Sequence, residues 1–291
     1  MKVIEGGVTA AKGYKAAGLR AGIKAGKTNK DMAMIYSEKE AVCAGTFTKN
    51  VVKAAPVKWD QQVVKSGAKA QAVVVNSGIA NACTGAEGFG YCKDTADAAA
   101  KALNISADGV LIGSTGVIGK QIPIDKLTAG IEALAGKKND TLENGTEAAK
   151  AIMTTDTFPK ELAVTIEVGG KTVTIGGMAK GSGMIHPNMC TMLAFITTDA
   201  VITKDALQKA FGFDNSVLSS GFSGDMLSAD SLNLENAFRM GGDSLDLSGM
   251  INLDQISLDV SGMPQMNLGD MIGSLNLTVK PGGMQKLSES V

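Results

Sequence analysis

The sequence has few of the residues that build metal centres and disulfide frameworks. It contains one histidine and four cysteines among 291 residues, and no two cysteines have the Cys-x-x-Cys spacing of zinc sites. We therefore expect no bound metal. Cysteines scattered singly along a chain are typical of reduced thiols in the cytosol, which predicts a cytoplasmic protein.

Long apolar runs and a strong charge of either sign are also missing. No run of 18 apolar residues is present, so the sequence predicts no membrane-spanning helix. The first residues, Met1 to Gly6, lack the apolar core of a secretory signal peptide. The formal net charge of −1 gives no reason to expect a nucleic acid or a membrane surface as a partner.

The chain that remains is apolar, rich in glycine and uneven in charge. Apolar residues make up 44% of it and glycines number 36, as in a globular protein with many turns. Residues 211–291 contain ten acidic and three basic residues, a net charge of −7, which leaves +6 for residues 1–210. A short repeat, Leu-Asp-Leu-Ser-Gly-Met, occurs at 245–250 and, with one change, at 258–263. We predict that residues 211–291 form a strand-rich tail foreign to the rest.

The first 210 residues alternate predicted strands with predicted helices. Apolar runs and a Gly-Gly turn predict strands at 70–76, 109–112, 161–168, 171–175 and 192–196. Alanine-rich and amphipathic segments predict helices at 91–103 and 124–134, and the end of another at 147–153. We also expect Ala33–Tyr36 to pair with Ala41–Phe47, and Ala55-Pro56 to be extended. Together these elements predict an α+β fold built in layers.

The segment Gly113-Ser-Thr-Gly-Val-Ile-Gly119 follows a predicted buried strand. It is not a phosphate-binding loop, because such a loop has four residues between its glycines and then Gly-Lys-Ser/Thr. Two interpretations stay open. The segment is a turn that presents backbone N–H groups and the Thr115 hydroxyl to a developing oxyanion, or it simply joins a strand to a helix.

A second segment, Lys180-Gly-Ser-Gly-Met-Ile-His-Pro-Asn-Met-Cys-Thr191, leads into the apolar run 192–196. A threonine hydroxyl is a weak nucleophile without a base. A threonine freed at a new N-terminus carries its own base, because the α-amine has a pKa of about 8. The alternative is that Thr191 is an ordinary threonine at the start of a strand.

From about Gly6 to about Lys209 the chain resembles the ornithine acetyltransferase family, the bifunctional glutamate N-acetyltransferases. Members cut themselves before a threonine in the setting Lys-Gly-Ser-Gly-Met-Ile-x-Pro-Asn-Met-Ala-Thr-Met-Leu. This sequence has Cys190 in place of the alanine. The resemblance stops soon after Lys209, since residues 211–291 do not align with the second half of the family.

The resemblance assigns catalytic roles to matching positions. It implies self-cleavage between Cys190 and Thr191, after which Thr191 is the nucleophile. It places Thr115 and Gly116 in the oxyanion hole. His186, the only histidine, is expected to be structural, because the family uses no histidine there and the freed amine of Thr191 already supplies a base.

The resemblance also assigns substrate contacts, at Thr154, Lys180 and Thr191. Taken alone, Thr154 is typical of a capped turn and Lys180 of a solvated surface. The implied reaction moves acetyl from N-acetylornithine to glutamate through an acetyl-threonine intermediate, in arginine biosynthesis. No cofactor is implied, although some members accept acetyl-CoA as the acetyl donor. Members assemble as α/β heterotetramers after processing.

The implied fold is a layered α/β/β/α sandwich, in which helices cover two stacked sheets. On this basis we divide the chain into the region of the family α-chain (1–190), the start of the β-chain (191–210) and the tail (211–291). Because the second half of the family is not found, the sandwich is expected to be incomplete. The competing hypothesis is a truncated or chimeric, non-catalytic polypeptide that carries only the first half of the enzyme.

Overall fold

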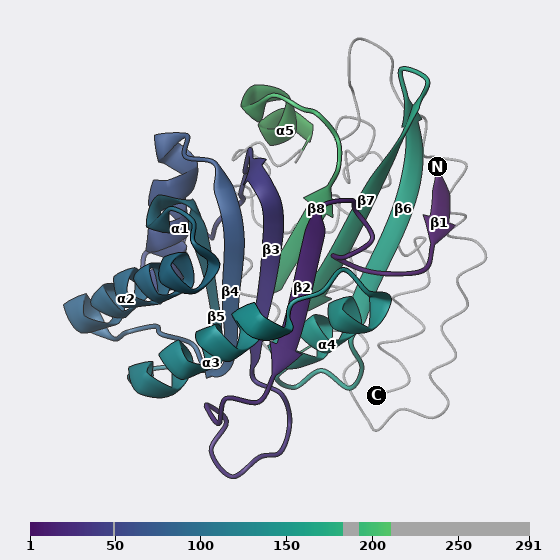
Figure 1. Cartoon of the computed structure of the whole chain (residues 1–291). Helices are drawn as coiled ribbons and strands as arrows, with labels where there is room; N and C mark the ends of the chain where they lie inside the picture. Colours follow the sequence, from purple (N-terminus) through teal and green to yellow (C-terminus); the bar gives the residue numbers. More distant parts are fainter. Residues whose placement is uncertain (49, 183–191, 211–291) are drawn as a thin grey trace, which may run out of the picture.

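A computed structural model describes residues 1–48, 50–182 and 192–210, and it consists of two stacked four-stranded sheets with helices (Figure 1). The strand order of the first sheet is β2 (Tyr14–Leu19), β3 (Met32–Ala41), β4 (Ala70–Ile79), β5 (Val110–Val117). That of the second sheet is β1 (Lys2–Ile4), β6 (Lys160–Val168), β7 (Lys171–Lys180), β8 (Leu193–Thr198). The helices are α1 (Ala55–Ser66), α2 (Gly85–Leu103), α3 (Ile124–Lys137), α4 (Leu142–Ile152) and α5 (Lys204–Ala210).

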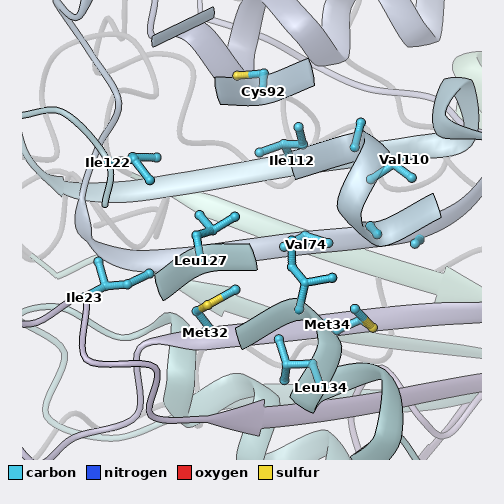
Figure 2. Close-up of a cluster of buried hydrophobic side chains, with 14 of the residues drawn as sticks. Ile23, Met32, Met34, Val74, Cys92, Val110, Ile112, Ile122, Leu127 and Leu134 are labelled. Carbon is cyan, nitrogen blue, oxygen red and sulfur yellow. The ribbon is translucent and has the colours of Figure 1, made fainter. Parts of the chain in front are cut away.

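The first sheet is buried on both faces, and β3 shows how. Successive side chains of a strand point to opposite faces. Met32 and Met34 join the core cluster that includes residues of α2 and α3, whereas Ala33 and Ile35 join the cluster shared with the second sheet. All four side chains are at most 3% exposed. Figure 2 shows the helix-side cluster, in which Leu134 lies close to the methionines.

Connections within the first sheet follow from its pairing. Strands β2, β3 and β4 are antiparallel, but β4 and β5 are parallel. A parallel pair needs a crossover, and α2 supplies it. Strand β5 lies at the edge of the sheet, and α1 covers this edge. The indole nitrogen of Trp59 donates to the Val110 carbonyl at 2.9 Å, and the Asp60 carboxylate accepts from the Ile112 amide at 2.8 Å. Side chains of α1 therefore form hydrogen bonds with backbone groups that would have no partner at the edge of a sheet.

Helix α4 packs against the first sheet on the face that meets the second sheet (Figure 1). Its packed face is made of small residues and one isoleucine: Gly145, Ala148, Ala149, Ala151 and Ile152. A Cβ at Gly18 of β2 would overlap the Glu147 carbonyl of α4. Small side chains on both elements thus allow the helix to approach the strand closely. The Thr141 hydroxyl accepts from the Asn144 amide and caps the start of the helix.

The second sheet is antiparallel throughout, and its outer face is exposed in part. Strands β6 and β7 form the predicted hairpin, and Gly169 and Gly170 both have positive φ, as a two-residue type I′ turn requires. The inner face carries Met178, which is 2% exposed, while Leu162 and Ile196 on the outer face are 59% and 55% exposed. These two residues help to line a shallow apolar groove of about 510 Å³ on that outer face.

Two expectations from the sequence are wrong. Ala33–Tyr36 does not pair with Ala41–Phe47, because β3 is one long strand that pairs with β2 and β4 and ends at Ala41. Ala55-Pro56 is not extended but begins α1, where proline is tolerated because the first helical N–H groups have no partner within the helix. The predicted strands and helices elsewhere in residues 50–182 are present, most of them longer than expected.

The α+β fold class is confirmed. The described residues form helix, sheet and sheet layers, in agreement with an incomplete sandwich. None of the helices in the described ranges is long and apolar enough to cross a membrane. The tail of residues 211–291 lies outside the described residues, and the three-part division of the chain stays a prediction.

Candidate functional site

Two residues of the predicted site meet where the two sheets come together. Lys180 is the last residue of β7, and its side chain is 3% exposed. Its ammonium donates to the Thr115 hydroxyl of β5 at 3.2 Å, across 65 residues of sequence. Thr115 itself is 6% exposed. The contact joins one sheet to the other, and Lys180 is a buried group rather than solvated surface.

Strand β5, which carries Thr115, approaches β4 very closely at Gly116. Gly116 has φ of 136° and pairs with Gly78 of β4, and a Cβ at Gly116 would overlap the backbone of Gly78. Only glycine satisfies both conditions. The register of β4 and β5 is irregular immediately after this pair. The predicted turn after residue 113 is thus wrong in extent, because β5 continues to Val117.

A ladder of buried polar groups lies beside Thr115 on β4 and β5. The Ser114 hydroxyl donates to the Asn76 side-chain carbonyl at 2.7 Å, and the Asn76 amide donates to the Ile79 carbonyl at 2.8 Å. The Ser77 hydroxyl donates to the Ala151 carbonyl at the end of α4, at 2.5 Å. These bonds use the polar side chains of the strand to hold β4, β5 and α4 in one arrangement.

Asp156, which sequence reasoning missed, ties the Thr154 turn to the end of β7. Its carboxylate accepts from the Thr154 amide at 3.1 Å, from the Gly181 amide at 2.8 Å and from the Lys160 ammonium at 2.6 Å. Burial opposes ionisation of this carboxyl, but the hydrogen bonds from Lys160, Gly181 and Thr154 prevail and lower its pKa to about 2. The signal in the sequence was an acid two residues after Thr154, within hydrogen-bonding reach of that turn.

The surroundings of Lys180 have opposing effects on the pKa of its ammonium. Burial lowers the pKa of its ammonium, the Asp156 carboxylate raises it, and the Lys160 ammonium lowers it again. A buried amine next to a hydroxyl can donate a hydrogen bond and place positive charge near an atom that becomes negative. Among the described residues no group of three or more His, Cys, Asp or Glu side chains could hold a metal ion.

The structure thus brings together three of the predicted groups. Thr115 and Gly116 lie on one strand, and Lys180 contacts Thr115. Thr154 is linked to the residue after Lys180, because Asp156 accepts from both the Thr154 and the Gly181 amides. Cys190, Thr191 and His186 lie outside the described residues. Their flanks are described: Lys180 of β7 pairs with Leu193 of β8. The chain therefore leaves and re-enters the described structure at neighbouring strand ends, beside Thr115.

Comparison with known proteins agrees with this architecture. The sequence model of the ArgJ family matches residues 15–231. The chain is 50% identical over 204 residues to the chloroplastic arginine biosynthesis bifunctional protein ArgJ of Oryza sativa subsp. indica, covering 70% of this chain and 44% of that protein. It is 51% identical over 211 residues to the ArgJ protein of Symbiobacterium thermophilum, covering 72% and 52%. The chain spans about half the length of the curated relatives it matches.

Solved structures give the same result. The crystal structure of the ArgJ protein of Bacillus halodurans is 43% identical, with a TM-score of 0.61 and coverage of 66% of this chain and 98% of that one. Ornithine acetyltransferase of Mycobacterium tuberculosis, solved in complex with ornithine, is 44% identical with a TM-score of 0.60, covering 66% and 99%. The resemblance seen in the sequence is confirmed, and the chain belongs to the ArgJ family.

Proposed function

We propose that this chain carries the nucleophile and the oxyanion-binding groups of an ornithine acetyltransferase that cleaves itself between Cys190 and Thr191. The observation that carries the proposal is the contact of Lys180 with Thr115. Lys180 ends β7, just before residues 183–191, and pairs with Leu193, which begins β8 just after them. Because Leu193 is two residues after Thr191, the described chain resumes beside these two groups.

The lengths of the solved relatives support the cleavage. About 192 residues, 66% of this chain, make up 98–99% of each of the two crystallised chains. Those chains are therefore close in length to residues 1–190, whereas the curated relatives are about twice as long.

Cleavage proceeds as an N-to-O acyl shift. The Thr191 hydroxyl attacks the Cys190 carbonyl, the peptide C–N bond breaks, and the nitrogen takes the proton. Water then hydrolyses the ester, which leaves a carboxylate on Cys190 and a free amine next to the hydroxyl of Thr191. That amine is the base that the hydroxyl lacked.

Acetyl transfer uses the same hydroxyl. Thr191 attacks the acetyl carbonyl of N-acetylornithine while its amine takes the hydroxyl proton. The amine returns that proton to the leaving nitrogen, and ornithine departs. The amine of glutamate then attacks the acetyl-threonine ester and gives N-acetylglutamate. Each addition creates an oxyanion, which Thr115 and Gly116 bind, and loss of one such donor raises a barrier by about 2.7–4 kcal/mol.

The other groups bind substrate. Thr154 and Lys180 contact the amino-acid part, and the charge of Lys180 stabilises negative charge close to Thr115. Ornithine in the Mycobacterium tuberculosis structure supports a small amino acid as the ligand. Acetyl-CoA is proposed only as an additional donor. The processed halves would assemble as an α/β heterotetramer in the cytoplasm.

The covalent intermediate provides the test. Incubation with N-acetylornithine and no glutamate should add one acetyl group to the peptide that begins with Thr191, detected by mass spectrometry, and glutamate should remove it. Thr191→Ala should show neither acetylation nor transfer. Thr191→Ala with wild-type transfer rates would contradict the proposal and favour the non-catalytic, truncated or chimeric polypeptide.

A further inference from the structure

The loop between β2 and β3 brings a second lysine, Lys24, to the turn that carries Thr154. The Lys24 ammonium donates to the Met153 carbonyl at 2.8 Å and to the Lys30 carbonyl at 2.9 Å. Met153 is the first residue after α4 and directly precedes Thr154. The first of these bonds joins segments 129 residues apart in sequence, so it fixes the end of α4 relative to the first sheet.

The backbone of this loop is itself held in place by a buried carboxylate. Asp31 is fully buried and accepts from the Ala21 amide at 2.6 Å and from the Lys24 amide at 3.0 Å. The Asp31 carbonyl in turn accepts from the Ser77 amide of β4 at 2.9 Å. The position from which the Lys24 side chain extends is thus set by the strand that also supports β5.

The side chain of Lys24 passes over Gly78. A Cβ at Gly78 would lie 2.8 Å from Cγ of Lys24, and Gly78 has φ of 114°, so glycine at this position leaves the room that the lysine stem occupies. Gly78 is also the partner of Gly116 in the register of β4 and β5. Lys24 therefore lies next to the strand pair that carries the predicted oxyanion hole.

The charged ammonium of Lys24 donates hydrogen bonds to neutral acceptors. Within the described ranges no ion pair includes Lys24, and both of its acceptors are backbone carbonyls. Burial lowers the pKa of its ammonium, the Asp31 carboxylate opposes this effect, and the Lys27 and Lys180 ammonium groups add to it. A hydrogen bond from a charged donor is about twice as strong as one between neutral groups.

We propose that Lys24 is a positioning residue of the acetyl-transfer site, which holds the Met153 carbonyl and thereby keeps Thr154 and Asp156 in place beside Gly181. The sequence of contacts is continuous: Lys24 binds Met153, the Thr154 amide binds Asp156, and Asp156 binds the Gly181 amide. The kinetic consequence rests on the proposed function, but the structural one does not.

Hydrogen exchange tests the structural consequence. Lys24→Met keeps the apolar stem and removes the donor, so the amides of Thr154 and Gly181 should exchange about tenfold faster than in the wild type. Lys27→Met is the matched control from the same loop and should leave both amides at the wild-type rate. Lys24→Arg, which keeps a charged donor, should restore most of the protection. Wild-type exchange in Lys24→Met, or equal acceleration in Lys27→Met, would overturn the proposal.

Kinetics tests the link to catalysis. Lys24→Met should raise KM for N-acetylornithine about tenfold with little change in kcat, because Thr154 contacts the amino-acid part of the substrate, which is bound equally in the ground state and the transition state. Lys24→Arg should recover most of the affinity. An unchanged KM, or a fall in kcat alone, would contradict a positioning role. If the wild type transfers no acetyl, the proposed function fails, and hydrogen exchange still decides the role of Lys24.

Discussion

The two sheets have the same number of strands but differ in how they are buried. The first, β2 to β5, is covered on one face by helices and on the other by α4 and the second sheet. The second, with β1, β6, β7 and β8, has an inner face in the core and an outer face with exposed Leu162 and Ile196. We therefore expect the first sheet to contribute more to stability than the second. The candidate site draws on both sheets, because Thr115 comes from the first and Lys180 from the second.

The largest expected effect contrasts one glycine from each sheet. Gly116→Ala would force a Cβ against the backbone of Gly78 at a φ of 136°, so the free energy of unfolding should fall by about 4 kcal/mol. Gly177→Ala in β7 is the matched control, because its new Cβ would lie at an ordinary van der Waals distance of 3.5 Å from the Phe195 carbonyl oxygen. It should change stability by less than about 0.5 kcal/mol. Urea unfolding followed by circular dichroism measures both, and equal losses would show that the strand pair is not tight.

A smaller effect contrasts two isoleucines. Ile131 of α3 is fully buried above the first sheet, and Ile131→Ala should cost about 3 kcal/mol through lost burial and the cavity that remains. Ile196→Ala, on the exposed face of the second sheet, should cost less than about 1 kcal/mol. The same unfolding experiment applies. A cost at Ile196 as large as that at Ile131 would mean that the outer face is covered.

The smallest expected effect on the free energy of unfolding comes from Asp156, at the junction between the sheets, and it depends on pH. The folded pKa of Asp156 is about 2, below its ordinary value of 3.8, so its stabilisation is present above about pH 4 and is lost as the pH falls towards 2. Asp156→Asn should lower the free energy of unfolding by about 2 kcal/mol at pH 7 and have little effect near pH 2.

The matched control for Asp156 is an exposed carboxylate. Glu38 pairs with Lys15 on the surface of the first sheet, and Glu38→Gln should leave unfolding unchanged at both pH values. Unfolding by urea at pH 7 and near pH 2 makes the comparison. A difference between wild type and Asp156→Asn that does not shrink at low pH would contradict the assigned pKa.

The parts of the fold that the sequence predicts are those with a strong local signal. The valines of β4 and the Gly169-Gly170 turn indicate their structures without help from the rest of the chain. Strand β2 was missed because Tyr14-Lys-Ala-Ala-Gly-Leu19 has two alanines and a glycine in place of typical strand residues. Ala16 and Gly18 face α4, and Ala17 faces the core cluster on the side of α2 and α3. In this strand tertiary packing overrides intrinsic preference.

The site was predictable only in part, for a related reason. The roles of Thr115 and Lys180 came from the resemblance, since no local pattern links residues 65 apart in sequence. Lys24 was missed because its partner Met153 is 129 residues away, and a lone lysine in a loop is typical of a solvated surface. Asp156 has the nearby partners Thr154 and Lys160, but its bond to Gly181 comes from a separate segment of the chain. Long-range hydrogen bonds of this kind become visible only once the sheets are stacked.

The most direct test of the account is the intact mass of the purified chain after prolonged incubation. We predict two fragments, one ending at Cys190 and one beginning at Thr191, from the wild type, and an uncut chain from Thr191→Ala. A wild type that remains a single species of 29.8 kDa would contradict the central claim that Thr191 becomes the first residue of a new chain.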